Sequence, residues 1–306
     1  MSLSKTETGA QFLARLGSRP SMMHIEPAFF GEGLKGKEVI ELYGAEGTGK
    51  SETLLHFIVR CILPKSWKSV ELSGCDAHVI FIDTDYKFSI LRLASLLERY
   101  ILNAVGRARQ NSDETDFQCP GSEETENFIK ECLKKLYIIR CTSSTQLIIT
   151  LHSLENIICN NPNISAVMID SISAFYWIDR YNGGESFAMQ EANMRLACEE
   201  LSKLVNTYNI TVFATKQELF KKKKDFERRD REKSTVIQEL DFEHQEYMCK
   251  SWQKLVTGRL VYKYVEIPGS GRRKFVVSAG PISEIVTFFV EFDEIQFLSN
   301  NEKLRL

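Results

Sequence analysis

Residues 44–51 decide the fold, and they read Gly44-Ala45-Glu46-Gly47-Thr48-Gly49-Lys50-Ser51. This stretch matches G-x-x-x-x-G-K-[ST], the pattern of a phosphate-binding P-loop. The glycines let backbone N–H groups close around phosphates, and a lysine in the place of Lys50 reaches the β- and γ-phosphates. The hydroxyl of Ser51 is placed for Mg²⁺. The stretch therefore predicts a site for ATP and Mg²⁺, although a chain can also retain such a loop as structure alone.

The residues on both sides of the loop fit a strand before it and a helix after it. Val39–Tyr43 is a short apolar segment. After the loop, Leu54, Ile58 and Ile62 recur at a spacing of four, which is typical of one helix face, and Pro64 ends the pattern. A helix that begins at the loop points its positive end at a bound anion. The context therefore strengthens the assignment of the P-loop.

The alternation of a buried strand with a helix continues along the chain. Apolar runs predict four further strands, at His78–Ile82, Leu136–Cys141, Ile164–Ile169 and Ile210–Ala214. Helical spacing is found between them, as in Ile90, Leu93, Leu97 and Ile101, and over Phe187–Tyr208. This alternation predicts an α/β fold with a mostly parallel, doubly wound sheet and right-handed crossovers.

The last part of the chain has a different pattern. Short strand patterns follow one another without helices between them, at Leu260–Val265, Phe275–Ser278, Val286–Glu291 and Ile295–Leu298. We expect them to extend the same sheet in antiparallel fashion. Residues 103–127 are polar, with Gly, Pro and acidic residues, and predict a flexible insertion. The predicted organisation is a short N-terminal extension, residues 1–38, and one core of residues 39–306.

Acidic and amide side chains follow the predicted strands, at the edge where ligands bind in open α/β sheets. Asp170 ends the strand Val167–Asp170, and its carboxylate is expected to hold the Mg²⁺ shell through water. Asp85 follows a neighbouring strand and fits two roles, a carboxylate that orients the attacking water and a helix N-cap. Gln217 lies beyond the fifth strand and fits either a γ-phosphate sensor or an ordinary surface residue.

Two loops carry residues suited to nucleic acid. Residues 177–186 include aromatic residues, Arg180 and a Gly-Gly pair. We expect Tyr176 and Trp177 to anchor this loop against the core, and we leave a DNA contact open for Arg180. Residues 218–250 are highly charged, and their basic run contains Lys221, Lys222, Lys223 and Lys224. These lysines fit a DNA contact, a nuclear import signal or a solvated loop.

Composition limits the function classes. The chain has 306 residues, with 39 basic against 41 acidic side chains and a net charge of −2, which excludes a generally basic nucleic-acid coat protein. No apolar run approaches the ~18 residues of a membrane span, and the N-terminus has no apolar signal region, so we expect no membrane contact. The eight cysteines include no C-x-x-C pair, which disfavours a zinc site. Reduced thiols in the cytosol or nucleus are the expectation.

In their order along the chain, these motifs resemble the core of the RecA-type recombinases and their paralogues. The resemblance covers about residues 10–265 and rests on Gly44–Ser51, Phe81–Asp85, Val167–Asp170, the loop to Gly184-Glu185, and Gln217.

The resemblance implies a RecA-like ATPase core that binds ATP and Mg²⁺. It implies homologous-recombination repair of DNA double-strand breaks in the nucleus. It also implies a heteromeric complex of paralogues, with the D-type paralogue as direct neighbour and single-stranded or branched DNA as the nucleic acid. Residues 177–186 and 218–250 correspond in position to the family's first and second DNA-binding loops.

The N-terminal region departs from the family pattern. Full-length recombinases carry a helical N-terminal domain and a linker with an F-x-x-A docking motif. Here 43 residues precede Gly44, and none of their phenylalanines fits F-x-x-A. We therefore expect this chain to accept a neighbour's linker on its own core and to sit at one end of a filament-like stack.

A second departure concerns Asp85, where active recombinases carry Glu. Aspartate is one methylene shorter, and a displacement of about 1 Å in a water-orienting group can cost on the order of a hundredfold in rate. We therefore expect ATP binding with weak hydrolysis. This favours a nucleotide-holding assembly subunit that helps to load or stabilise the recombinase on single-stranded DNA. The alternative is a DNA-stimulated ATPase that remodels recombinase filaments, while a P-loop small-molecule kinase is disfavoured because no convincing lid is present.

Overall fold

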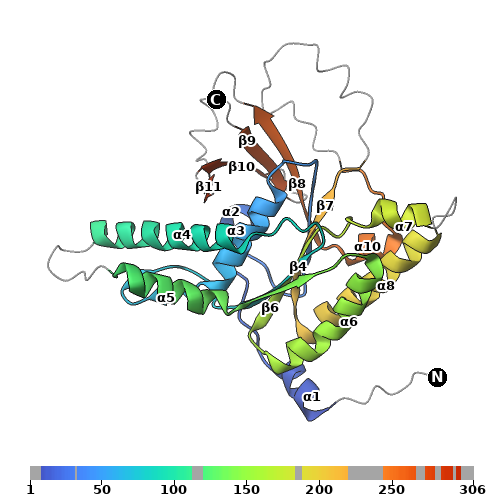
Figure 1. Ribbon diagram of the computed structural model, residues 1–306, viewed down its shortest axis with the longest axis horizontal. Coiled ribbons are helices and arrows are strands. Elements are labelled where there is room, and N and C mark those ends of the chain that lie inside the picture. The colour runs from blue at the N-terminus through green and yellow to red at the C-terminus, as the bar shows by residue number, and fades with distance from the viewer. Residues whose placement is uncertain are drawn as a thin grey trace.

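The computed structural model describes residues 8–31, 33–111, 120–182, 188–219, 244–266, 273–279, 284–291 and 294–297. Within these residues the chain forms a nine-stranded sheet with helices on both faces, as Figure 1 shows. The strand order is β11-β10-β9-β8-β1-β7-β6-β4-β5. The P-loop strand β1 therefore lies near the middle of the sheet, and β5 lies at one edge.

The strands fall into a parallel part and an antiparallel part. The parallel part holds β1 (Val39–Gly44), β4 (His78–Asp83), β5 (Leu136–Arg140), β6 (Ile164–Asp170), β7 (Thr211–Gln217) and β8 (Gly258–Glu266). The antiparallel part continues from β8 through β9 (Arg273–Ala279), β10 (Glu284–Glu291) and β11 (Glu294–Phe297). The predicted mostly parallel sheet is confirmed, and so is its C-terminal extension. The extension differs in one respect, because β8 pairs with β1 in parallel.

The strands of the parallel part are buried on both faces, which explains their continuous apolar runs. In β6, Met168 packs in the core on one face while Val167 and Ile169 pack in the core on the other. Helices α3 (Lys50–Ile62), α4 (Ile90–Asn111) and α5 (Ser122–Leu133) cover the first face. The second face is covered by α6 (Ser144–Asn160), α8 (Ala188–Tyr208) and α10 (Lys250–Leu255).

The structure corrects the predicted insertion at residues 103–127, except that Ser122 followed by Glu123 and Glu124 already indicated the start of a helix. Helix α4 continues to Asn111 and α5 begins at Ser122, so both ends of that stretch are helical. The physical reason is burial, since Ala104 and Val105 pack into the core on the first face. Residues 112–119 lie outside the described residues. On α4, Leu93, Leu97 and Ile101 are fully buried as predicted, but Ile90 is 42% exposed.

The residues before the P-loop strand join the same core. Two short helices, α1 (Gly9–Leu16) and α2 (Pro27–Phe30), precede β1. Phe29 of α2 packs edge-on against Phe57 of α3, with ring centroids 5.7 Å apart. The guanidinium of Arg19 donates hydrogen bonds to the carbonyl oxygens of Ile164 and Tyr208, at 2.8 and 2.6 Å. Residues 19–31 therefore pack with the core rather than apart from it.

Two smaller elements complete the description. A two-stranded sheet joins β2 (Ser66–Trp67) and β3 (Val70–Glu71) beside α5, where the rings of Trp67 and Phe128 stack at 4.3 Å. Helix α7 (Tyr176–Asn182) follows β6.

Candidate functional site

The predicted P-loop lies between the end of β1 and the start of α3. Gly47 and Gly49 have φ angles of 74° and 91°, a backbone region that favours glycine. A Cβ on Gly44 would lie 2.7 Å from the carbonyl oxygen of Tyr262, and one on Gly49 would lie 3.1 Å from the ring of Phe275. The glycines are therefore required by backbone conformation and by the close approach of β8 and β9.

Lys50 is folded against this loop. Its Nζ donates hydrogen bonds to the carbonyl oxygens of Gly44 and Ala45, at 2.8 and 2.6 Å. The Thr48 hydroxyl donates to the Ala45 carbonyl oxygen at 2.8 Å and braces the turn. Burial lowers the pKa of Lys50 to about 8, although nearby carboxylates, Asp170 first, act in the opposite direction. The partners of the ammonium group are neutral oxygens, so its charge is available to an anion.

Carboxylates that follow the neighbouring strands act on this lysine through their charge, without a direct contact. Asp170 ends β6, and its Oδ1 accepts a 2.5 Å hydrogen bond from the Thr215 hydroxyl. Burial and the charge of Asp170 raise the pKa of Asp85, and the charge of Asp85 in turn acts on Lys50. The structure thus brings Lys50, Asp85 and Asp170, which lie far apart in the sequence, to one edge of the sheet.

The loop that carries Asp85 is fastened to β6. The Thr84 hydroxyl accepts from the Ser171 N–H at 2.5 Å and donates to the Ser171 carbonyl oxygen at 2.8 Å. Asp83 is buried and accepts from the Phe88 N–H at 3.4 Å. Helix α4 begins only at Ile90, five positions after Asp85, so of the two predicted roles the helix N-cap does not fit.

The residues at this edge fit a magnesium ion. Asp170 offers a carboxylate and Ser51 a hydroxyl, and Mg²⁺ prefers hard oxygen ligands while it keeps several waters. When bound with a nucleotide, the ion would neutralise phosphate charge.

Gln217 ends β7 beside the P-loop. Its N–H donates to the Ser173 hydroxyl at 3.0 Å, and its carbonyl oxygen accepts from the Tyr247 hydroxyl at 2.5 Å. The next residue, Glu218, donates its N–H to the Gly44 carbonyl oxygen at 3.0 Å. The backbone at Gln217 is therefore held between the P-loop and the residues that follow the charged stretch.

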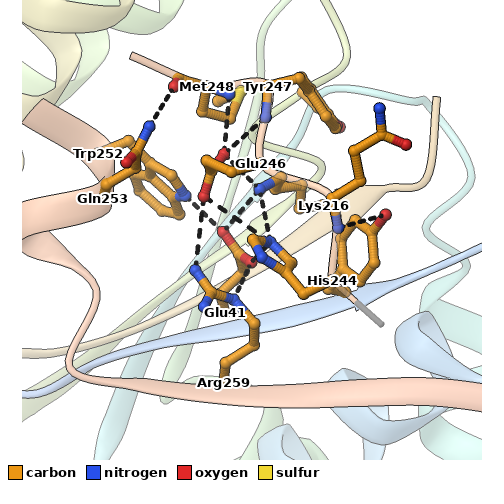
Figure 2. Close-up of polar contacts among 12 residues, drawn as sticks. Glu41, Lys216, His244, Glu246, Tyr247, Met248, Trp252, Gln253 and Arg259 are labelled. Carbon is orange, nitrogen blue, oxygen red and sulfur yellow. Dashed lines mark hydrogen bonds and ion pairs between the residues drawn. The ribbon is translucent and has the colours of Figure 1, made fainter. Parts of the chain in front are cut away.

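A buried cluster of charges lies next to this site, and sequence reasoning missed it. Figure 2 shows Glu41 of β1 at its centre. Glu41 is fully buried and accepts hydrogen bonds of 2.6 Å from both Arg259 Nε and Trp252 Nε1. Burial alone would raise the pKa of Glu41, but His244, Lys216, Arg259 and Trp252 lower it to about 2. The sequence does contain a signal for this cluster, because Glu41 lies inside the apolar run Val39–Tyr43. A charge buried in such a strand needs partners of opposite charge or hydrogen-bond donors.

Lys216 is the second member of this cluster. Its ammonium group is fully buried and lies 2.7 Å from Glu246 Oε1 and 3.4 Å from Glu41 Oε2. It also lies 4.8 Å from the ring centroid of Tyr247. Glu246 accepts the N–H of Met248 at 2.8 Å, so the ion pair fixes the backbone before α10.

The same cluster has the spacing of a metal site, with ligand atoms of Glu41, His244 and Glu246 within 4.8 Å of one another. Lys216 and Arg259 already lie among these atoms and balance the two carboxylates. A cation there would be repelled, so we interpret the cluster as structural.

The two predicted DNA loops are described in part. Tyr176, just before the loop of residues 177–186, is buried as predicted. The prediction that Trp177 also anchors this loop is wrong, because its side chain is 48% exposed. Asp179 takes the anchoring role, since its Oδ1 accepts from the Ser144 hydroxyl at 2.7 Å. The guanidinium of Arg180 lies 5.5 Å from the ring centroid of Trp177. Lys221, Lys222, Lys223 and Lys224 lie outside the described residues.

In the part of the chain that the structure describes, no helix has the length and apolar character to cross a membrane.

Comparisons with known proteins agree with this geometry. A family model described as Rad51 matches residues 24–112, which contain the P-loop. The DNA repair protein XRCC2 of Mus musculus is 37% identical over 276 residues, which is 89% of this chain and 89% of the mouse protein. The XRCC2 homolog of Arabidopsis thaliana is 28% identical over 291 residues, or 84% of this chain and 77% of that protein.

A more distant relative is the DNA repair and recombination protein RadA of Metallosphaera sedula. It is 24% identical over 216 residues, which is 71% of this chain and 53% of that protein. The identity to the mouse protein over nine-tenths of both chains decides the assignment: this chain belongs to the XRCC2 family of RecA-like, Rad51-related DNA repair proteins.

Proposed function

We propose that this chain is an ATP-binding assembly subunit of a heteromeric paralogue complex, which helps to load or stabilise the recombinase on single-stranded DNA in the nucleus. The observation that carries the proposal is the convergence of Lys50, Asp85 and Asp170 at the P-loop edge of the sheet. The ammonium group of Lys50 would bind the phosphates, and the carboxylate of Asp170 with the hydroxyl of Ser51 would hold the Mg²⁺ that accompanies them.

The nucleotide part of the proposal rests on charge and backbone. The helix α3 begins at Lys50, so the free N–H groups of its first turn face the loop and favour an anion. The ammonium group of Lys50 leaves carbonyl oxygens for phosphate oxygens when a nucleotide binds. Charged phosphate oxygens then replace neutral carbonyl oxygens as its hydrogen-bond acceptors, which favours binding.

Weak hydrolysis is expected from Asp85. Its carboxylate is near enough to act on Lys50 and Asp170, but it is one methylene shorter than glutamate. The shorter side chain would hold the attacking water about 1 Å away from the position that it needs for attack on the γ-phosphate. Such a displacement lowers the rate of hydrolysis on the order of a hundredfold.

The assembly part of the proposal concerns strand β5. It is the edge strand at one end of the sheet, with β4 as its neighbour. Edge strands present unpaired N–H and C=O groups that a strand from another chain can complete. Ile138 is 40% exposed on this strand, and Tyr137 and Ile139 are partly buried beside α6. A linker from a D-type paralogue would fit here as an added strand with apolar anchors.

The test is co-expression of the full chain with the D-type paralogue. Nucleotide released from the purified complex is measured for the wild type, for Lys50→Ala and for Lys68→Ala, a control at an exposed lysine paired with Glu124. We expect bound nucleotide in the wild type and the control and its loss in Lys50→Ala. An equally assembled complex that holds no nucleotide in any form would refute ATP binding and leave the assembly role.

The alternative function, a DNA-stimulated ATPase, is tested on the same preparations. Turnover comparable to that of an active recombinase, lost in Asp85→Ala, would establish the alternative. Slow turnover that increases in Asp85→Glu would support the assembly subunit.

A further inference from the structure

An open cavity of about 600 Å³ lies beside the buried charge cluster, with which it shares Glu246. Its walls come from helix α7, from the first turn of α8, and from residues 245–253, which lead into α10 (Figure 1). None of residues 44–51 lines it, so the cavity is separate from the P-loop. Its volume falls within the range of small-molecule sites, about 300–1,000 Å³.

One polar side chain in the wall lacks a partner. Gln190 of α8 is 5% exposed, and its side-chain amide forms no hydrogen bond with any other residue that the structure describes. Because Gln190 lines the cavity, its N–H donors and its carbonyl oxygen are available to a ligand there. A carboxamide presents a donor and an acceptor side by side. It therefore matches a group with an acceptor beside a donor, such as the edge of a nucleobase.

Two tyrosines form the aromatic part of the wall. Tyr176 is 5% exposed, and its ring meets the ring of Tyr247 edge to face, with centroids 5.0 Å apart. The Tyr247 hydroxyl donates to the carbonyl oxygen of Gln217 at 2.5 Å, which fixes that ring in place. Met248 adds a thioether side chain to the same wall. Fixed aromatic rings are surfaces on which a planar base stacks.

The rim of the cavity carries charges of both signs. Lys250, the first residue of α10, is exposed and forms no ion pair within the described part of the chain. Arg180 of α7 adds a second cation to the lining, and both suit a phosphate. The carboxylate of Glu246 is already held in the buried charge cluster. Glu191 supplies an exposed carboxylate, a group that accepts hydrogen bonds from ribose hydroxyls in other nucleotide sites.

We propose that this cavity binds a nucleoside 5′-monophosphate, with the base against Tyr176 and Gln190, a sugar hydroxyl on Glu191 and the phosphate at Lys250. Each part of such a ligand has a counterpart in the wall. A free nucleotide and one nucleotide of a single strand share this chemistry. Glu191 favours the free ribonucleotide, because ribose offers two hydroxyls while the sugar inside a DNA strand offers none. The site is independent of ATP binding at the P-loop.

The experiment titrates the purified full chain carrying Lys50→Ala with AMP in a calorimeter, so that the P-loop lysine does not contribute. We expect one site that binds AMP more tightly than deoxy-AMP, and the preference should disappear in Glu191→Ala. Two lysines of α10 form a matched pair. Lys250→Ala should weaken AMP binding about threefold, whereas Lys254→Ala, which does not line the cavity, should leave it unchanged.

Gln190→Leu tests the amide, with circular dichroism to verify folding. Leucine has a similar volume and no polar group, so removal of an amide without a partner should leave the melting temperature unchanged or raise it. The Kd for AMP should rise on the order of tenfold. A lowered melting temperature would show that the amide has a partner inside the protein and would overturn the proposal. Unchanged AMP affinity in Gln190→Leu would overturn it as well.

A single-stranded deoxyadenosine oligonucleotide identifies the source of the ligand. Binding of AMP that depends on Gln190 assigns the cavity to a free nucleotide. Binding of the oligonucleotide alone, weakened by Gln190→Leu and unaffected by Lys254→Ala, assigns it to one nucleotide of a strand. If neither probe binds in a way that depends on Gln190, the cavity is not a nucleotide site.

Discussion

Two buried lysines at the centre of the sheet have opposite surroundings. Lys50 is 7% exposed and donates its closest hydrogen bonds to the carbonyl oxygens of Gly44 and Ala45. Lys216 is fully buried and forms ion pairs with Glu246 and Glu41. Lys50 follows the carboxyl end of β1, and Lys216 lies on β7. Because β1 and β7 pair with each other, the two lysines are neighbours in the fold.

The difference assigns a different task to each lysine. The charge of Lys216 is balanced inside the protein, so it holds β1, β7 and the residues before α10 together. The ammonium group of Lys50 contacts only neutral oxygens, and the nearby carboxylates do not touch it. A negatively charged phosphate is therefore a stronger hydrogen-bond partner for it than the carbonyl oxygens of Gly44 and Ala45. Lys50 should therefore determine ligand binding, and Lys216 should determine stability.

The largest expected effect follows from removal of the balanced charge. Lys216→Met removes the fully buried cation that lies between Glu41 and Glu246 and leaves the two carboxylates underbalanced, so the free energy of unfolding should fall by about 3–5 kcal/mol. Urea unfolding measures it. Lys50→Met is the matched control, and it should change stability by less than about 1 kcal/mol because no carboxylate loses a contact. Equal losses in the two variants would remove the distinction between the lysines.

The decrease of the free energy of unfolding at acid pH should depend on Glu41. Its pKa is 4.5 in ordinary surroundings and about 2 in the fold, so its contribution is complete above pH 4.5 and is lost as the pH falls through 2. The contribution should amount to about 3 kcal/mol at roughly 1.4 kcal/mol per unit of pKa. Unfolding measured from pH 7 to 2 tests this against Glu41→Gln, which should lose less stability over the acid range. Parallel curves would contradict the assignment.

Nucleotide affinity should depend on the other lysine. Lys50→Ala removes a charge-assisted phosphate contact, and the Kd for Mg-ATP should rise on the order of a hundredfold, which corresponds to about 2.7 kcal/mol. Isothermal titration of the complex measures the change. Lys216→Arg keeps the balancing charge and should leave the Kd within about threefold of the wild-type value. A larger loss in Lys216→Arg would show that both lysines serve the nucleotide.

The smallest expected effect is a pH dependence of nucleotide affinity. The pKa of Lys50 is lowered to about 8 in the protein, so its ammonium form prevails below pH 8 and is lost as the pH rises above it. Because phosphate binds the charged form, affinity should be constant from pH 6.5 to 7.5 and fall by about tenfold between pH 8 and 9 at most. Lys50→Arg, which stays charged, should show a flatter profile. An unchanged Kd up to pH 9 would place the pKa of Lys50 well above 8.

Local sequence was sufficient for the parallel sheet and the P-loop. Buried parallel strands must be apolar on both faces, and a phosphate loop must have glycine where the φ angle is positive, so both leave a signal within a few residues. The last turns of α4 left no such signal, whereas Ser122 followed by Glu123 and Glu124 predicted the start of α5, which is confirmed. The mostly polar residues 103–111 are compatible with a loop, and the packing of Ala104 and Val105 against the core favours the helix there.

The sequence alone determined that Lys50, Asp85 and Asp170 lie at the carboxyl edge of the sheet, because each follows a recognisable strand or loop. Tertiary structure alone decided which charges balance one another. Glu41, Lys216, Glu246 and Arg259 come from four separate segments, and the chain order contains no record of their 2.6–3.5 Å contacts. Burial makes each of these groups depend on its partner, and only the fold brings the partners together.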